Sequence, residues 1–301
     1  MNTTEEKAAA RHWVGKSKGM PLGYRIFVFI LRTLCVYPAY SLLVFVVLYY
    51  FLFSMTTTRH SYNFFRLRCG FSVLKSWWKV YVSYFMIGQV IIDKVVVTSG
   101  LSKQFTFKSN GAENMVQIRD ERRGGILLGA HLGNWEIAGH AFNRYSNLTV
   151  NIVLYDGESE QIKKYMEGVM GNKKSFHIIP IKNDLSHVYL MSEALERGEL
   201  ICMHADRFME GNRTQLVKFF GEEARLPSGP FQLVKSLKAP YTFVYGVKNG
   251  ATHYDLFCRP LRHPRQFANV QEMMNDYAQD LEGMVKQYPE QWFNYYDFWE
   301  K

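Results

Sequence analysis

The sequence of 301 residues has little that would support a disulfide scaffold or a structural zinc site. Its four cysteines, Cys35, Cys69, Cys202 and Cys258, are far apart and form no Cys-x-x-Cys pair. Scattered thiols of this kind are typical of a protein that faces a reducing compartment such as the cytoplasm. Internal repeats and low-complexity linkers are also missing. The chain is long enough to bury a large core without covalent cross-links.

Acidic residues are outnumbered, with 27 Asp and Glu against 36 Lys and Arg, which gives a net charge of +9. Such an excess attracts nucleic acid, acidic phospholipid or a phosphate-bearing cofactor. Aromatic residues make up 16% of the chain, and many lie in its first third within apolar runs. A base-stacking surface would instead alternate them with basic residues. We therefore expect an anionic membrane surface as a partner and no nucleic acid.

An apolar run extends from Ile26 to Phe53, and its stretch from Leu34 onward contains no charged residue. About 20 such residues cross the ~30 Å hydrocarbon core of a bilayer, whereas Pro38 and basic residues on both sides weaken a simple spanning assignment. Three interpretations stay open: a transmembrane helix, a monotopic anchor and a buried core helix. We assign residues 1–70 to a basic N-terminus and an N-terminal hydrophobic membrane-anchoring helix. An aromatic-rich helix is expected from Ser72 to Val90.

From about Lys103 onward, short β-branched runs alternate with helical patterns, which indicates an α/β domain with a central sheet. We assign residues 71–301 to this domain. Strands are expected at residues 104–108, 125–130, 148–154, 176–181, 200–204, 215–220, 241–248 and 253–259. Helices are expected at residues 112–122, 135–145, 158–170, 185–197, 230–237 and 270–287.

The segment GGILLGAHLGNWEIAGH, from Gly124 to His140, places His131 between a buried apolar strand and the start of a helix. Functional groups are often exposed at such an edge of an α/β sheet. Glu136, five residues on, can orient the imidazole nitrogen that faces away from substrate. A pair of this kind can deprotonate a hydroxyl or amine as it attacks a thioester. Asn134 is an expected N-cap for the helix.

By itself this spacing is weak, since nine histidines and a common pair of acidic residue types give roughly one chance match. A core histidine near a helix-start acid is the structural alternative. A metal interpretation also exists, because Glu136 and His140 are spaced i, i+4 with His131 nearby. No His-Glu-x-x-His order occurs and no third ligand is evident, so we predict no metal site.

The segment LLGAHLGNWE resembles the first motif of the lysophospholipid acyltransferase superfamily, in its lipid A biosynthesis lauroyl/myristoyl acyltransferase branch. Further matches follow in order: ICMHADR from Ile201, FFGEEARLPSGP from Phe219, APYTFVYG from Ala239 and YPEQWFNYYDFW from Tyr288. The resemblance covers nearly the whole chain and favours the catalytic interpretation. It implies a glycerol-3-phosphate acyltransferase-like fold, a mixed central sheet flanked by helices.

The resemblance makes His131 the general base and Glu136 its orienting partner, without an acyl-enzyme. It points to Asn134, Asp206 and Arg207 as substrate-binding residues. Further candidates are Arg225, Ser228 and Gly229, in a glycine-flanked turn before a helix N-terminus, a geometry suited to anions. Arg207 replaces the Gln or His that is more usual in the family.

The implied reaction moves a fatty acyl chain from acyl carrier protein (ACP) or coenzyme A (CoA) to a hydroxyl or amine of a bacterial lipid, without a cofactor. The implied location is the bacterial inner membrane, with the catalytic domain facing the cytoplasm. The acceptor stays open among lipid A-like and other lipids. Two other functions remain as alternatives: a non-catalytic membrane lipid-binding protein, and a metal-dependent hydrolase that uses Glu136 and His140.

Overall fold

The structure is a computed structural model, and it describes residues 36–98, 101–134, 137, 148–155, 177–181, 184–209 and 211–299. The chain divides into two compact units. The first joins the residues up to 105 to the C-terminal residues from 283 onward, and most of the remainder forms the second. The units therefore divide the chain at Phe105, whereas the sequence analysis placed a functional boundary at residue 70.

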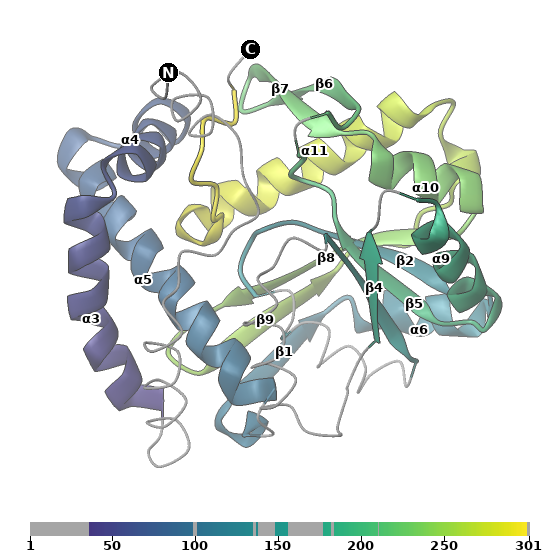
Figure 1. The fold of residues 1–301 in the computed structure, drawn as a ribbon, viewed down its shortest axis with the longest axis horizontal. Coiled ribbons are helices and arrows are strands. Elements are labelled where there is room, and N and C mark those ends of the chain that lie inside the picture. The colour runs from purple at the N-terminus through teal and green to yellow at the C-terminus, as the bar shows by residue number, and fades with distance from the viewer. Residues whose placement is uncertain are drawn as a thin grey trace. The chain divides into compact units, whose positions relative to one another are not determined.

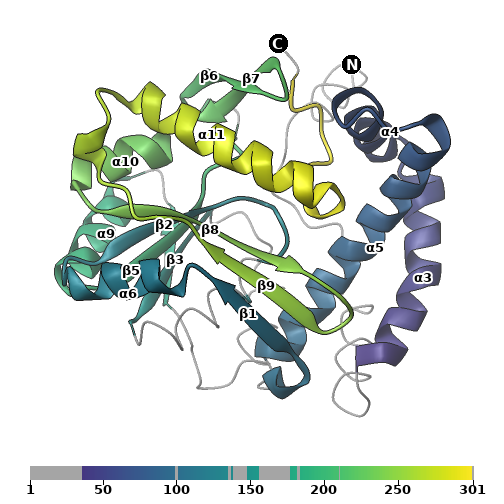
Figure 2. The same ribbon diagram turned by 180° about the vertical axis from the view of Figure 1, so that it is seen from behind.

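The first unit is helical. It contains α3 (Val36–Phe53), α4 (Met55–Asn63), the π-helix η1 (Phe64–Arg68), α5 (Val73–Thr98) and the short 3-10 helices η2 (Ser102–Gln104) and η4 (Pro289–Gln291). Helices α3 and α5 lie side by side (Figures 1 and 2). The buried positions of α3 recur every three or four residues and form one helix face: Val36, Ala39, Tyr40, Leu43 and Val47. Gly88 on α5 admits Leu43, since a Cβ there would lie 2.5 Å from Leu43 Cδ1.

The other face of α3 is apolar but exposed, with Phe45 at 71% and Phe53 at 70%. Both α3 and α5 are long and apolar enough to cross a membrane. The sequence predicted the helix from Ser72 to Val90, and α5 confirms it while extending to Thr98. A helix that is apolar on all sides is expected in a protein core or in a bilayer. The exposure of Phe45 and Phe53 shows that the residues described in the structure leave one side of α3 uncovered.

The C-terminal aromatic residues pack within this helical unit. The ring of Phe64 contacts Trp292 at a centroid distance of 5.0 Å and stacks on Trp299 at 6.2 Å. Lys79 of α5 forms an ion pair with Glu290. The closing motif predicted from the resemblance therefore contributes to the hydrophobic packing of the first unit.

The second unit is built on a mixed seven-stranded sheet with the order β1-β9-β8-β2-β5-β3-β4. Its strands are β1 (Thr106–Asn110), β2 (Gly125–Gly129), β3 (Val150–Tyr155), β4 (His177–Ile181), β5 (Leu200–His204), β8 (Tyr241–Lys248) and β9 (His253–Cys258). Among these seven strands, only the pair β8 and β9 is antiparallel. Every residue of β2 and β8 is buried, as expected for central strands covered on both faces.

In the described part of the chain, four helices accompany the sheet: α6 (Ala112–Asp120), α9 (Ser186–Glu196), α10 (Gly229–Leu237) and α11 (Val270–Gln287). Helix α11 crosses one face of the sheet over β8 and β2 (Figures 1 and 2). Its Tyr277 is fully buried and its ring lies 5.2 Å from that of Phe243 on β8. The predicted α/β fold with a mixed, helix-flanked sheet is confirmed. The helices predicted at 135–145 and 158–170 lie mostly or wholly outside the described residues.

The glycine-flanked turn predicted before α10 is correct at its end, where Ser228 is the N-cap and Gly229 the first residue of the helix, but it is wrong for residues 222–227. Strands β6 (Thr214–Phe219) and β7 (Glu222–Pro227) instead form a two-stranded antiparallel hairpin. Phe220 and Gly221 make its turn, with φ of 54° and 80°. Left-handed conformations at both central residues suit the tight turn of a β-hairpin. Arg225 therefore lies exposed on a strand, paired with Leu216.

Candidate active site

The site forms where the central strands β2 and β5 end. These strands are parallel neighbours, and Gly129 at the end of β2 pairs in register with His204 at the end of β5. His131 follows β2 by two residues, and Asp206 follows β5 by two residues. Because the carboxyl ends of parallel strands meet at one edge of a sheet, two segments 75 residues apart in the chain come together there.

Asp206 holds His131 by two hydrogen bonds. The backbone N–H of His131 donates to Oδ2 at 2.9 Å, and ring Nδ1 lies 2.8 Å from Oδ1. The Asp206 side chain is 1% exposed, whereas that of His131 is 25% exposed. An ionised carboxylate can only accept, so Nδ1 carries the ring proton and Nε2 keeps its lone pair. This is the tautomer that a general base needs.

The electrostatics of the pair favour an ionised aspartate beside a neutral imidazole. Burial opposes charge on Asp206, but its contacts with His131 and the nearby Arg207 charge hold the pKa of this carboxyl well below its usual range. Burial, helped by the Arg207 charge, lowers the pKa of His131, and Asp206 offsets only part of that effect. His131 is therefore unprotonated and able to accept a proton at neutral pH.

Close backbone packing fixes the loop that carries His131. Gly133 has φ of 68°, and a Cβ there would lie 2.1 Å from the carbonyl oxygen of Gly246 on β8. The backbone N–H of Asn134 donates to that same oxygen at 2.6 Å. Only glycine fits residue 133 in this conformation. In contrast, a Cβ at Gly129 would meet only ordinary contacts, at 3.5 Å.

A second contact supports the loop from the side of α11. The Tyr277 hydroxyl donates to the carbonyl oxygen of Gly129 at 2.8 Å, and the backbone N–H of Ala205 donates to the same oxygen at 3.0 Å. Gly129, two residues before His131, is thus held both by the residue that follows β5 and by α11. This double attachment limits movement of the base.

Asn134 has the structural position expected of it. Its Oδ1 accepts a hydrogen bond from the backbone N–H of Ile137 at 3.2 Å, and its side chain is 1% exposed. An oxygen that accepts from the third residue of a helix is an N-cap. The substrate-binding role predicted for Asn134 stays a prediction. The other predicted groups on this segment, Glu136 and His140, lie outside the described residues.

The remaining predicted substrate residues divide into two sets. Arg207 is half-buried and its charge acts on both His131 and Asp206. Ser228 is buried and its hydroxyl donates to the carbonyl oxygen of Arg213 at 3.2 Å, while Gly229 begins α10. None of the contacts described for Arg225, Ser228 or Gly229 involves His131 or Asp206, so the structure does not join these three to the site.

His204 belongs to the site, although sequence reasoning did not single it out. Its Nδ1 lies 3.2 Å from His131 Nε2, and the two ring centroids are 4.1 Å apart. A signal was present, because His204 ends the predicted strand only two residues before Asp206, at the same edge of the sheet. Within the motif ICMHADR, the sequence predicted a role for Asp206 and none for the nearby His204.

One atom from each of His131, His204 and Asp206 can be chosen so that all lie within 4.8 Å of one another, a spacing that can suit a metal ion. In the described arrangement, however, His131 uses opposite ring nitrogens toward its two partners. The three side chains therefore form a hydrogen-bonded line. A metal ion needs ligand atoms that converge on one point, so binding here would break that line.

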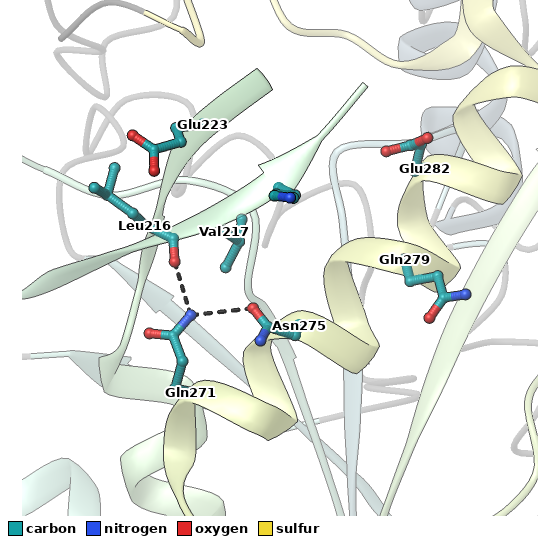
Figure 3. A pocket seen from close by; sticks show the side chains of 8 residues that line it. Leu216, Val217, Glu223, Gln271, Asn275, Gln279 and Glu282 are labelled. Carbon is teal, nitrogen blue, oxygen red and sulfur yellow. Dashed lines mark hydrogen bonds between the residues drawn. The ribbon is translucent and has the colours of Figure 1, made fainter. Parts of the chain in front are cut away.

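A cavity of about 550 Å³ lies between the β6–β7 hairpin and α11 (Figure 3). Gln271 reaches across it, donating to the carbonyl oxygen of Leu216 at 2.7 Å and to Asn275 Oδ1 at 3.1 Å. Six of the eight residues that line it have polar or charged side chains: Lys218, Glu223, Gln271, Asn275, Gln279 and Glu282, beside Leu216 and Val217. None of the three side chains at the sheet edge contributes to it. Such a lining does not suit an acyl chain.

The geometry at the sheet edge defines an acid–base site in which a buried carboxylate orients an accessible imidazole. Sequence comparison identifies the family: the family model of the bacterial lipid A biosynthesis acyltransferases matches residues 73–300. The chain belongs to this family, as the resemblance predicted. The match includes α5, the whole sheet and every residue of the site, and α3 precedes it.

Individual relatives match a smaller part of this chain than the family model does. Two phosphatidylinositol mannoside acyltransferases are similar to this chain. That of Mycolicibacterium smegmatis is 30% identical over 38% of this chain and 37% of its own length. That of Mycobacterium tuberculosis is 28% identical over 44% of this chain and 42% of its own length. The matched segments thus span about two fifths of these relatives. The crystal structure of the 1-acyl-sn-glycerophosphate acyltransferase PlsC from Thermotoga maritima aligns over 77% of this chain and 94% of its own, with 12% identity and a TM-score of 0.37.

Proposed function

We propose that this protein transfers a fatty acyl chain from an ACP or CoA thioester to a hydroxyl, or an amine, of a membrane lipid, with His131 as the general base. The observation that carries this proposal is the Asp206–His131 pair, which leaves the Nε2 lone pair on a ring that is one quarter exposed. Membership in a lipid acyltransferase family supplies the class of reaction.

In the proposed step, Nε2 of His131 takes the proton of the acceptor hydroxyl while its oxygen attacks the thioester carbonyl. This attack forms the new C–O bond of a tetrahedral intermediate, and collapse of the intermediate restores the carbonyl and breaks the C–S bond. The imidazolium then returns its proton to the departing thiolate. Asp206 stabilises the imidazolium without becoming protonated, and no acyl-enzyme forms.

The orienting role predicted for Glu136 is kept as part of the proposal, beside the contact observed for Asp206. If Glu136 also reaches the site, two carboxylates support one base. Replacing each carboxylate separately measures how much it contributes to the rate of acyl transfer. Asp206→Asn disturbs the hydrogen bond to Nδ1, and Glu136→Gln removes the charge of Glu136. The proposal expects losses of acyl transfer in both variants.

Arg207 is proposed to bind a phosphate of the donor or acceptor, or to stabilise the developing oxyanion. A fixed guanidinium suits both tasks. Its half-buried position and its electrostatic effect on His131 support this assignment. Asn134, Arg225, Ser228 and Gly229 remain predicted substrate contacts.

The acceptor is proposed to be a bacterial lipid, with a glycolipid as the first choice. The support is the family description, which names lipid A, and two relatives whose names specify a phosphatidylinositol mannoside. Hydroxyl groups of a sugar are ordinary acceptors for a base of this type. The donor is ACP-bound or CoA-bound, and both are offered in the test below.

The membrane proposed is the bacterial inner membrane, with the catalytic unit facing the cytoplasm. Helix α3 has 18 residues, about 27 Å of helix, and its outer face is apolar and exposed. That surface is suited to hydrocarbon whether the helix spans the bilayer or lies in one leaflet. The free thiols of Cys69, Cys202 and Cys258 fit a reducing compartment.

The test is acyl transfer by the full chain in bilayers or detergent, with acyl-ACP and acyl-CoA offered separately and a bacterial lipid extract as acceptor. Mass spectrometry of the product names the lipid and the chain length together. His131→Ala should abolish product, whereas His177→Ala, an exposed histidine on the edge strand β4, should not. Full transfer by His131→Ala would refute the proposed chemistry, and product loss on chelation would favour the metal-dependent alternative.

A further inference from the structure

We propose that His204 is a positioning residue that occupies the Nε2 lone pair of His131 until an acceptor hydroxyl displaces it, and thereby limits hydrolysis of the thioester donor. This inference rests on the proposed function, because it assigns a task to a second histidine in the same reaction. His204 Nδ1 lies 3.2 Å from His131 Nε2, the atom that must accept the proton.

The direction of this hydrogen bond follows from Asp206. Both Asp206 oxygens accept from His131, one from the backbone N–H and one from Nδ1. His131 Nε2 is then unprotonated and can only accept. The Nδ1–H of His204 must therefore donate to His131 Nε2. Hydrogen bonds are then donated along the line from His204 to His131 and from His131 to Asp206.

The packing makes room for this contact. His204 ends β5 directly opposite Gly129 of β2. A Cβ built at Gly129 would lie 3.5 Å from His204 Cδ2, an ordinary contact distance. A methyl group at residue 129 would therefore lie in van der Waals contact with the imidazole. The ring therefore lies over a position with no side chain.

The consequence concerns the base before the acceptor arrives. Hydrogen bonds at both nitrogens fix the plane of the His131 ring, and the one from His204 engages the lone pair. The lone pair of His131 Nε2 then already accepts a hydrogen bond from His204 and is not available to a water molecule at the site. An acceptor hydroxyl that binds through the rest of its lipid exchanges its own O–H for the His204 N–H, one hydrogen bond for another.

Without His204, water can be deprotonated by Nε2 and attack the thioester. A C–O bond forms, the C–S bond breaks, and the proton returns to the thiolate, giving a free fatty acid and a free thiol. His204 therefore raises the ratio of acyl transfer to hydrolysis. Its hydrogen bond also stabilises neutral His131, so its removal should raise the pKa of the base. The other charged groups facing this pair in the described part of the chain are Asp206 and Arg207.

The experiment compares His204→Leu with His204→Asn in the full chain, measuring both free fatty acid and acylated lipid. An Asn amide can place a donor near the position of Nδ1, whereas Leu has none. We expect Leu to raise the hydrolysis-to-transfer ratio about two- to tenfold, the worth of one hydrogen bond, and to move the acid limb of kcat/KM up by about half to one pH unit. Asn should stay near the wild type in both.

Titration of ¹⁵N-labelled His131 by NMR supplies a readout that does not require turnover. A wild-type ratio together with an unchanged His131 pKa in the folded His204→Leu protein would overturn the positioning role. Equal changes in Asn and Leu would also overturn it, since only Leu removes the donor. Failure of the proposed function looks different, because acylated lipid is then absent from the wild type or unaffected by His131→Ala.

Discussion

The carboxylate of Asp206 contacts His131 twice, through the backbone N–H and through ring Nδ1. A single buried group therefore sets both the place of the residue and the tautomer of its side chain. Two bonds to one carboxylate make the arrangement sensitive to a change of a single atom at residue 206.

Asp206→Asn is expected to leave the fold intact and to lower kcat/KM by roughly 10²–10⁴-fold. If the Asn oxygen accepts from the backbone N–H of His131, its amide N–H faces Nδ1 and moves the ring proton to Nε2. The base then has no lone pair toward the acceptor. Steady-state acyl transfer measures the loss, and ¹⁵N shifts of His131 report the tautomer. Asp120→Asn, at an exposed site on α6, is the control, and a near-normal rate for Asp206→Asn would contradict the assignment.

The acid limb of kcat/KM is expected below the ordinary histidine pKa of about 6.5. Burial first, and then the Arg207 charge, lower the pKa of His131, so the unprotonated base persists to lower pH. Because the folded pKa lies below the unfolded one, the associated stability is present above about pH 6.5 and is lost as the pH falls through the folded value. Arg207→Gln should move the limb to higher pH. A limb above pH 7 in the wild type would contradict this account.

Gly133→Ala is expected to destabilise the protein and to displace His131. A left-handed conformation of a residue other than glycine costs about 1–3 kcal/mol, and here the new Cβ would also meet the carbonyl oxygen of Gly246 at 2.1 Å. Gly198→Ala is a matched control, since its φ is 74° but its Cβ would have no neighbour closer than 3.9 Å. Thermal unfolding should show a larger loss for Gly133→Ala; equal losses would contradict the crowding argument.

The double change Phe45→Ser and Phe53→Ser is expected to weaken bilayer binding with little effect on the fold. Burying each exposed ring in hydrocarbon contributes about 1.5 kcal/mol or more, so the pair lowers the partition coefficient roughly a hundredfold. Sedimentation with phosphatidylglycerol vesicles measures it. Tyr189→Ser, on α9 of the second unit and 67% exposed, should bind as the wild type does. Equal binding by all three proteins would place the membrane contact elsewhere.

Much of the fold followed from local patterns. Strands β5 and β8 and helix α11 have the predicted boundaries, because continuous apolar runs and an amphipathic stripe are local signals. Strand β7 was not predicted because Glu222, Glu223 and Ala224 have low strand propensity. It forms because the tight turn at Phe220 brings it back along β6.

The site was predictable only where it is local in sequence. His131 follows a strand and precedes an N-cap, and both signals lie within a few residues. Its contact with Asp206 depends instead on β2 and β5 being neighbours, which a single sequence does not reveal. The contact with His204 depends on the same pairing. The motifs therefore predicted residues at the ends of both strands, but not the hydrogen bonds that join His131 to Asp206 and His204.

The close approach of Gly133 to Gly246 also bears on how this protein can diverge. Residue 133 has no side chain, and any side chain placed there would collide with the backbone of Gly246. A substitution at this position therefore cannot change the site without moving β8. A change of acceptor specificity is therefore expected at other positions of this edge, such as the half-buried Arg207. Duplicated copies of this gene would be expected to differ last at Gly133.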